Sequence, residues 1–145
     1  MYSFILDLHS ITRWIVLITG IVATIAAIIG WVKKKEWTAT DNKMGLIYTI
    51  SFDIQLLLGL MLYLWLSPLT KLAFTDFGAA MADKDLRFYA VEHLAIMLLA
   101  LILAHVGRVL SKKAIGVKKF MWAAIFFGIS LLLVLGSIPW FRPLL

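Results

Sequence analysis

The sequence predicts an all-α integral membrane protein, a bundle of four helices that forms one domain over residues 1–145. Of its 145 residues, 63% are hydrophobic and 15% are charged, whereas about 25% are charged in an average soluble domain. The apolar residues form continuous runs, and a run of about 20 residues crosses a hydrocarbon layer as an α-helix. Four runs reach that length, at residues 11–32, 45–66, 89–110 and 120–140.

Positive charge marks one end of the predicted bundle. Nine of the 14 Lys and Arg residues lie in or beside the two short connections between runs. Such loops stay in the cytoplasm, so we expect the long connection and both termini outside. The net charge of +6 is then a topology signal, and no nucleic-acid partner is expected. The nine residues are Lys33, Lys34, Lys35, Lys43, Arg108, Lys112, Lys113, Lys118 and Lys119.

Local signals place the helix boundaries. The first helix is expected to begin near Asp7 or earlier, and the second to be capped by Thr40 or Asp41 and to end before Pro68. The long connection, residues 70–88, carries apolar residues at loosely helical spacing. It is either an amphipathic helix on the membrane surface or an irregular loop. The short connections make helices one and two, and helices three and four, antiparallel neighbours in an up-down bundle.

Two of the three histidines point to a cofactor. His9 and His93 lie on the first and third helices, which run in the same direction, and both lie toward the outer leaflet. Two neutral imidazoles that face each other can bind a haem iron axially. Helical rise places His9 one to two turns further out than His93. The alternative is that His9 only forms hydrogen bonds at the interface.

Two arginines are candidates for the haem propionates. Arg13 follows His9 by four residues and shares its helix face. Its anion is either a propionate or Glu92. Arg87 precedes His93 by six residues, about 9 Å further out by helical rise. Arg87 either binds a propionate or extends its charge into the interface, as many arginines do.

A second group of polar residues forms a possible proton or quinone site: Asp53, Gln55, His105 and Glu92. An intramembrane acid is a functional candidate by default. Asp53 either relays protons, binds a quinone or forms an interhelical hydrogen bond. His105 is rotated about 120° from His93 along the helix, and it either packs against Arg108 or Asp53 or binds a metal.

Several other chemistries have no basis in the sequence. With no cysteine, disulfides, iron–sulfur clusters, thiolate ligands and covalently attached c-type haem are excluded. No phosphate-binding loop or nucleophile–base set is present. Three scattered histidines without acids at ligand spacing make a poor zinc site.

Three segments resemble one half of the haem A synthase family: "LHSITRW", "IQLLLGLMLYL" and "AVEHLAIMLLALIL". The resemblance implies a four-helix bundle with a haem between histidines on the first and third helices, which correspond to His9 and His93. Here Arg13 follows His9 by four residues instead of directly, and there is one bundle instead of two. The chain also resembles short bacterial cytochrome b-like membrane proteins.

These observations lead to one expected function and two alternatives. We expect a b-type cytochrome of a bacterial inner membrane, with one non-covalent haem b and a role in electron transfer. We favour an electron-transfer protein or a respiratory-complex subunit over a stand-alone enzyme. Its expected partner is a quinone or a redox protein at the outer face. The alternatives are a cofactor-free structural or assembly subunit of a membrane complex, and a proton-conducting homo-oligomer that uses Asp53 and His105.

Overall fold

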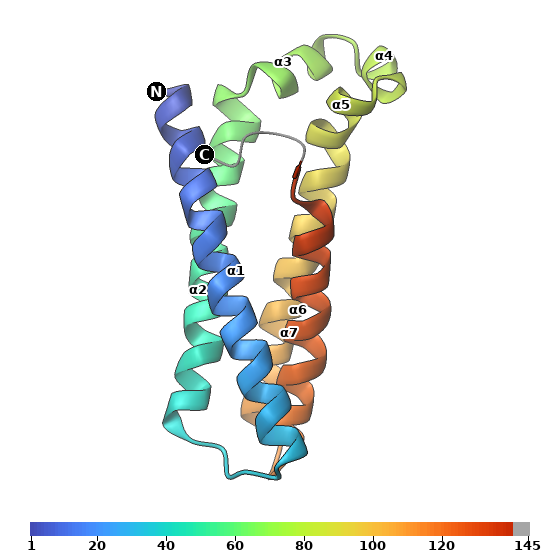
Figure 1. Cartoon of the computed structure of the whole chain (residues 1–145). Helices are drawn as coiled ribbons and strands as arrows, with labels where there is room; N and C mark the ends of the chain where they lie inside the picture. The colour runs from blue at the N-terminus through green and yellow to red at the C-terminus, as the bar shows by residue number, and fades with distance from the viewer. Residues whose placement is uncertain (141–145) are drawn as a thin grey trace.

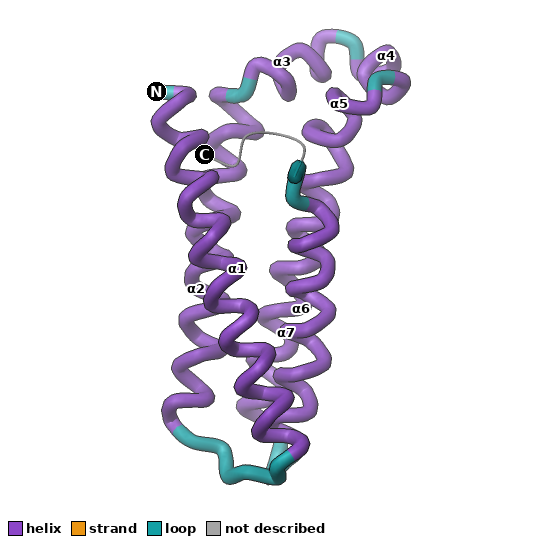
Figure 2. The backbone as a smooth tube through the Cα atoms, viewed as in Figure 1, coloured by secondary structure: helices purple, strands orange, loops and turns teal. Residues whose placement is uncertain are grey.

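The four apolar runs form four long helices in the computed structural model, which describes residues 1–140 (Figure 1). All four are long and apolar enough to span a membrane, which confirms the predicted all-α class and a multi-pass membrane protein in contact with lipid. No strand occurs in the part of the chain that the structure describes (Figure 2). The long helices are α1 (Tyr2–Val32), α2 (Ala39–Met61) with the π-helical turn η1 (Leu62–Leu66), α6 (His93–Lys113) after the π-helical turn η2 (Phe88–Glu92), and α7 (Lys118–Ser137).

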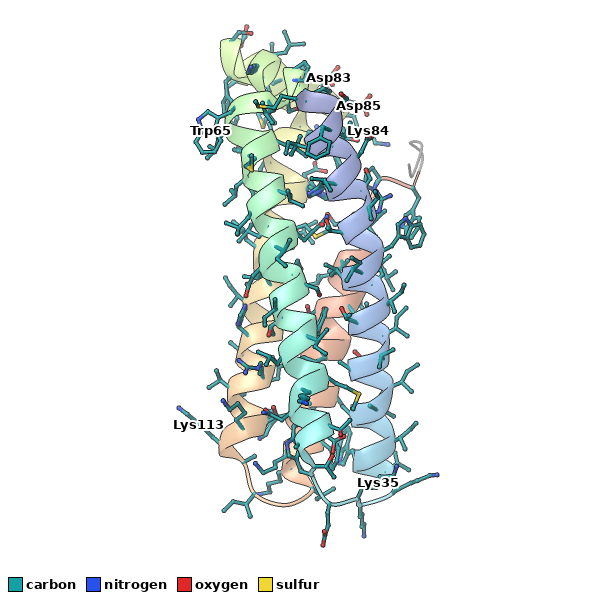
Figure 3. The ribbon with its side chains drawn as sticks, turned by 90° about the vertical axis from the view of Figure 1, so that its left-hand side faces the viewer. Lys35, Trp65, Asp83, Lys84, Asp85 and Lys113 are labelled. Carbon is teal, nitrogen blue, oxygen red and sulfur yellow. The ribbon has the colours of Figure 1, made fainter. Side chains whose placement is uncertain are left out.

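The helices pack as a square in which each has two neighbours. α1 packs against α2 and α7, and α6 packs against α7 and α2. Both short connections lie at one end of the bundle, and the long connection between α2 and α6 lies at the other, beside the N-terminus (Figure 1). Lys35 and Lys113 mark the first end, whereas Asp83, Lys84 and Asp85 mark the second (Figure 3).

α2 begins earlier than the sequence predicted. Its N-cap is Thr38, not Thr40 or Asp41. The Asp41 carboxylate accepts hydrogen bonds from the Thr38 amide at 2.8 Å and from the Thr38 hydroxyl at 2.7 Å. The Asp41 amide donates to the Thr38 hydroxyl at 3.4 Å. This reciprocal capping box stabilises the first turn, so Asp41 acts as the third helical residue.

The long connection is helical, in three short pieces. They are α3 (Pro68–Thr75), α4 (Phe77–Ala82) and α5 (Lys84–Arg87). A polar side chain caps each start, because Ser67, Asp76 and Asp83 accept from backbone amides three residues further on. The expected single amphipathic helix is therefore broken at Asp76 and Asp83, and the alternative of an irregular loop is wrong.

Small residues bring the helices close together in the lower half of the bundle. Ala100 and Ala104 of α6 are fully buried, and a Cβ added at Gly107 would lie 2.5 Å from Phe126 Cβ. Tyr48 is also fully buried and packs edge-on against Phe127. Small residues permit this close helix packing in membrane proteins. Toward the α3 end, a cavity lies between the helices.

Candidate functional site

The cavity has a volume of about 390 Å³, within the range of small-molecule and cofactor sites. All four long helices contribute to its wall, and Leu69 and Thr70 of α3 contribute from the end of the bundle. Most of the lining is aliphatic or aromatic, with a few polar side chains among them. The polar lining includes His9, Ser10, Arg13, Gln55, Tyr63 and His93.

His93 is held in one orientation by the end of α7. Its Nδ1 lies 2.9 Å from the carbonyl oxygen of Ser137. Because a carbonyl only accepts, Nδ1 carries the proton and donates it. The proton-free Nε2 then keeps its lone pair, which is the state required of a metal ligand.

The π-helical turn η2 ends directly before His93. A π-helical turn changes the direction of the side chains that follow it and often occurs at functional sites. Tyr63 of η1 donates a hydrogen bond to the carbonyl oxygen of Ala90 in η2 at 2.7 Å. The two π-helical turns are therefore joined beside the cavity, and the helix that carries His93 is tied to α2.

His9 is positioned through its backbone and by a glycine. Gln55 Nε2 donates to the carbonyl oxygen of His9 at 2.9 Å, and the Thr12 hydroxyl donates to the other amide atom, Gln55 Oε1. A Cβ at Gly59 would lie 3.1 Å from His9 Cε1, so the imidazole lies against the bare backbone of α2. Among the described residues no hydrogen-bond partner reaches His9 Nδ1, which is buried.

The structure brings His9, His93 and Arg13 to one cavity. His9 and His93 therefore line the same cavity, although the sequence places His9 further out along its helix. Two imidazoles and one cation can hold a planar, anionic metal complex.

Arg87 and Glu92 form an ion pair away from this group. Arg87 Nε lies 2.7 Å from Glu92 Oε1, and Arg87 Nη1 donates to the Met81 carbonyl oxygen at 2.9 Å. Both side chains are about half-exposed. Glu92 thus pairs with Arg87, whereas Arg13 lies at the cavity.

Asp53 and His105 form a third, separate arrangement. Asp53 Oδ1 and His105 Nε2 lie 2.8 Å apart, and both side chains are half-exposed. The pairing with Asp53 that the sequence left open for His105 is present. Gln55, two residues after Asp53, points to the opposite side and lines the cavity. The four residues grouped as a possible proton or quinone site therefore occupy three places.

Sequence reasoning missed Gly59, Tyr63 and Ser137. Gly59 follows Gln55 by four residues, so it lies on the same helix face, and this spacing was a usable signal. Ser137 acts mainly through its backbone carbonyl, and a contact made by the backbone cannot be predicted from the residue type.

Among residues 1–140, no three His, Cys, Asp or Glu side chains come together as a metal-binding group. A haem iron needs only two protein ligands, because the macrocycle supplies the others. Comparisons with protein-family models, curated proteins and solved structures find no match.

Proposed function

We propose that the chain is a b-type cytochrome that binds one non-covalent haem b in the cavity and transfers single electrons. The observation that carries the proposal is that His9 and His93, from α1 and α6, line one mostly apolar cavity. A histidine in a membrane span is costly, and axial ligation gives both histidines a reason to be there.

The donor set fits a haem. Nδ1 of His93 is engaged by the Ser137 carbonyl at 2.9 Å, so Nε2 is the available ligand atom. On the other side, Gln55 fixes the backbone at His9. Such outer contacts set the orientation and basicity of a ligating imidazole. The aliphatic lining, including Leu94 and Met97, suits the apolar edge of a porphyrin.

Arg13 is the residue that would pair with a propionate. It lines the cavity together with both histidines, and a guanidinium forms strong paired hydrogen bonds with a carboxylate. Arg87, the other sequence candidate, is paired with Glu92 and is not among the residues that line the cavity. We therefore assign propionate binding to Arg13 and a structural role to Arg87.

A bound haem would supply a one-electron carrier, and the protein would tune it through ligands, burial and hydrogen bonds. The chain would hold the iron between imidazoles, exclude water with its apolar wall and neutralise a propionate. We infer an up-down bundle with the basic end in the cytoplasm, so that the cavity lies toward the outer face of a bacterial inner membrane. Its electron partner is then a membrane quinone or a redox protein at that face.

A reduced-minus-oxidised absorption spectrum of the purified protein tests the proposal. We expect the α and β bands of a b-type haem and a haem-to-protein ratio near one from the pyridine haemochrome assay. A colourless protein that also fails to bind added haemin would overturn the proposal and favour a cofactor-free subunit of a membrane complex.

A further inference from the structure

The pair of Asp53 and His105 lies on the outside of the bundle, at the junction of α2 and α6. The two side chains are 46% and 40% exposed. Their contact joins Asp53 Oδ1 to His105 Nε2 at 2.8 Å, and the other polar atom of each side chain, Oδ2 of Asp53 and Nδ1 of His105, takes no part in it. The pair therefore presents two polar atoms to whatever surrounds this face.

The pair also lies deep in the membrane. Asp53 is ten residues after Lys43, about 15 Å by helical rise, and His105, which is bonded to Asp53, lies at the same depth, one helical turn before Arg108. The hydrocarbon layer is about 30 Å thick, so both groups lie near its middle. Exposed polar atoms at that depth are costly unless a partner satisfies them.

The side chains around the pair define the chemistry of that partner. Exposed aliphatic residues lie one helical turn from the pair on both helices, together with the partly buried Arg108, so the surroundings favour a ligand that is mainly apolar. A hydroxyl group satisfies the pair best, because it donates to a carboxylate oxygen and can donate to or accept from an imidazole nitrogen. The surrounding exposed residues are Ile50 and Leu57 on α2, with Ile102 and Val109 on α6.

The pair is also close to the cavity. Phe52, the residue before Asp53, lines the cavity, and so does Leu56 on the next turn. Asp53 therefore lies on one side of α2, and the cavity lies against the other side. A ligand at the pair would therefore lie beside whatever the cavity holds.

We propose that Asp53 and His105 bind the headgroup of a membrane-soluble quinol, whose isoprenoid tail lies along the exposed aliphatic residues of α2 and α6 beside the pair. A quinol combines the required aromatic hydroxyl with solubility in the bilayer. Binding at this site does not require haem in the cavity, so the two proposals can fail separately.

Photolabelling tests the site. Purified protein in lipid nanodiscs is irradiated with a short-chain azidoquinone, with excess decylubiquinol as competitor, and labelled peptides are identified by mass spectrometry. We expect competitor-sensitive labelling in residues 46–60 and 98–109. Asp53→Asn and His105→Gln should each weaken it about tenfold or more, the effect of losing a charge-assisted hydrogen bond.

Two further variants separate binding from folding. Glu92→Gln alters an acid–base pair of similar exposure at the end of the bundle and should leave labelling unchanged. Ile102→Trp places a bulky side chain on the exposed face beside the pair while it keeps Asp53 and His105, and it should abolish labelling. Labelling elsewhere, or labelling that Asp53→Asn, His105→Gln and Ile102→Trp all leave unchanged, would overturn the proposal. An unlabelled site would also overturn the proposal. A dimer that native mass spectrometry detects and that Asp53→Asn dissociates would then show that a second copy covers the pair.

Discussion

His93 Nδ1 lies 2.9 Å from the carbonyl oxygen of Ser137, the last residue of α7. The final carbonyls of a helix have no partner within the helix, so this oxygen is free to accept from the imidazole. The contact joins α6 to the end of α7 and fixes the ring nitrogen that carries the proton. The opposite nitrogen, Nε2, is the atom that would ligate the iron of the proposed haem.

The first prediction separates the histidines. His93→Ala removes a proposed axial ligand, and we expect the bis-histidine haem spectrum to be lost. His105→Ala is the matched control on the same helix, because His105 pairs with Asp53 outside the cavity. It should retain the spectrum. Equal haem loss in the two variants would argue against the ligand assignment.

The second prediction concerns Gly59. A Cβ there would lie 3.1 Å from His9 Cε1, whereas a Cβ at Gly136 would meet nothing within 4 Å. We expect Gly59→Leu to displace the His9 imidazole and to lower haem affinity about 10- to 100-fold, as for loss of an outer contact to a ligand. Gly136→Leu, measured by the same haemin titration, should bind normally. A Gly59→Leu variant with unchanged affinity would refute the placement of His9 against α2.

The third prediction tests the role of Gln55. This buried side chain bonds to the carbonyl oxygen of His9 and to the Thr12 hydroxyl. Gln55→Leu removes both bonds, and we expect the free energy of unfolding to fall by about 1–3 kcal/mol. Unfolding by sodium dodecyl sulfate, followed by circular dichroism, measures the change. Leu57→Ala, on the exposed side of the same helix, should have a smaller effect, and the reverse order would contradict this role.

The fourth prediction separates stability from cofactor binding. Ser130 donates to the Ala100 carbonyl oxygen at 2.7 Å, so the Tyr48 hydroxyl donates to Ser130 at 2.8 Å. This chain links α2, α7 and α6 inside the core. Tyr48→Phe should destabilise the bundle by about 1–2 kcal/mol while the haem spectrum is retained. A loss of haem without a loss of stability would contradict the separation of core and cavity.

The sequence predicted the four spanning helices because each depends on one property, a long apolar run. The ends of the helices depend on which residue caps each helix, and this choice is harder to predict when several neighbouring residues are good caps. Thr38, Thr40 and Asp41 are all good capping residues, and only the reciprocal bonds between Thr38 and Asp41 decide among them. The short helices of the long connection had a usable signal, because Ser67, Asp76 and Asp83 each cap one.

The polar side chains that line the cavity were predictable from the sequence, but their supporting contacts were not. His9, His93 and Arg13 could be found because polar residues are rare in apolar spans. The π-helical turn before His93 and the contact with Ser137 depend on how α6 and α7 are aligned, which no local pattern determines. Likewise Arg87 and Glu92, five residues apart, lack the usual three- or four-residue spacing of helical ion pairs. They meet across the π-helical turn.

The electron paramagnetic resonance spectrum of the oxidised, haem-loaded protein tests most directly whether His9 and His93 hold one iron between them. We predict a low-spin ferric signal typical of two imidazole ligands, replaced in both His9→Ala and His93→Ala by a high-spin signal or by loss of haem. A wild-type spectrum that is high-spin, or a low-spin signal that survives either substitution, would contradict the account.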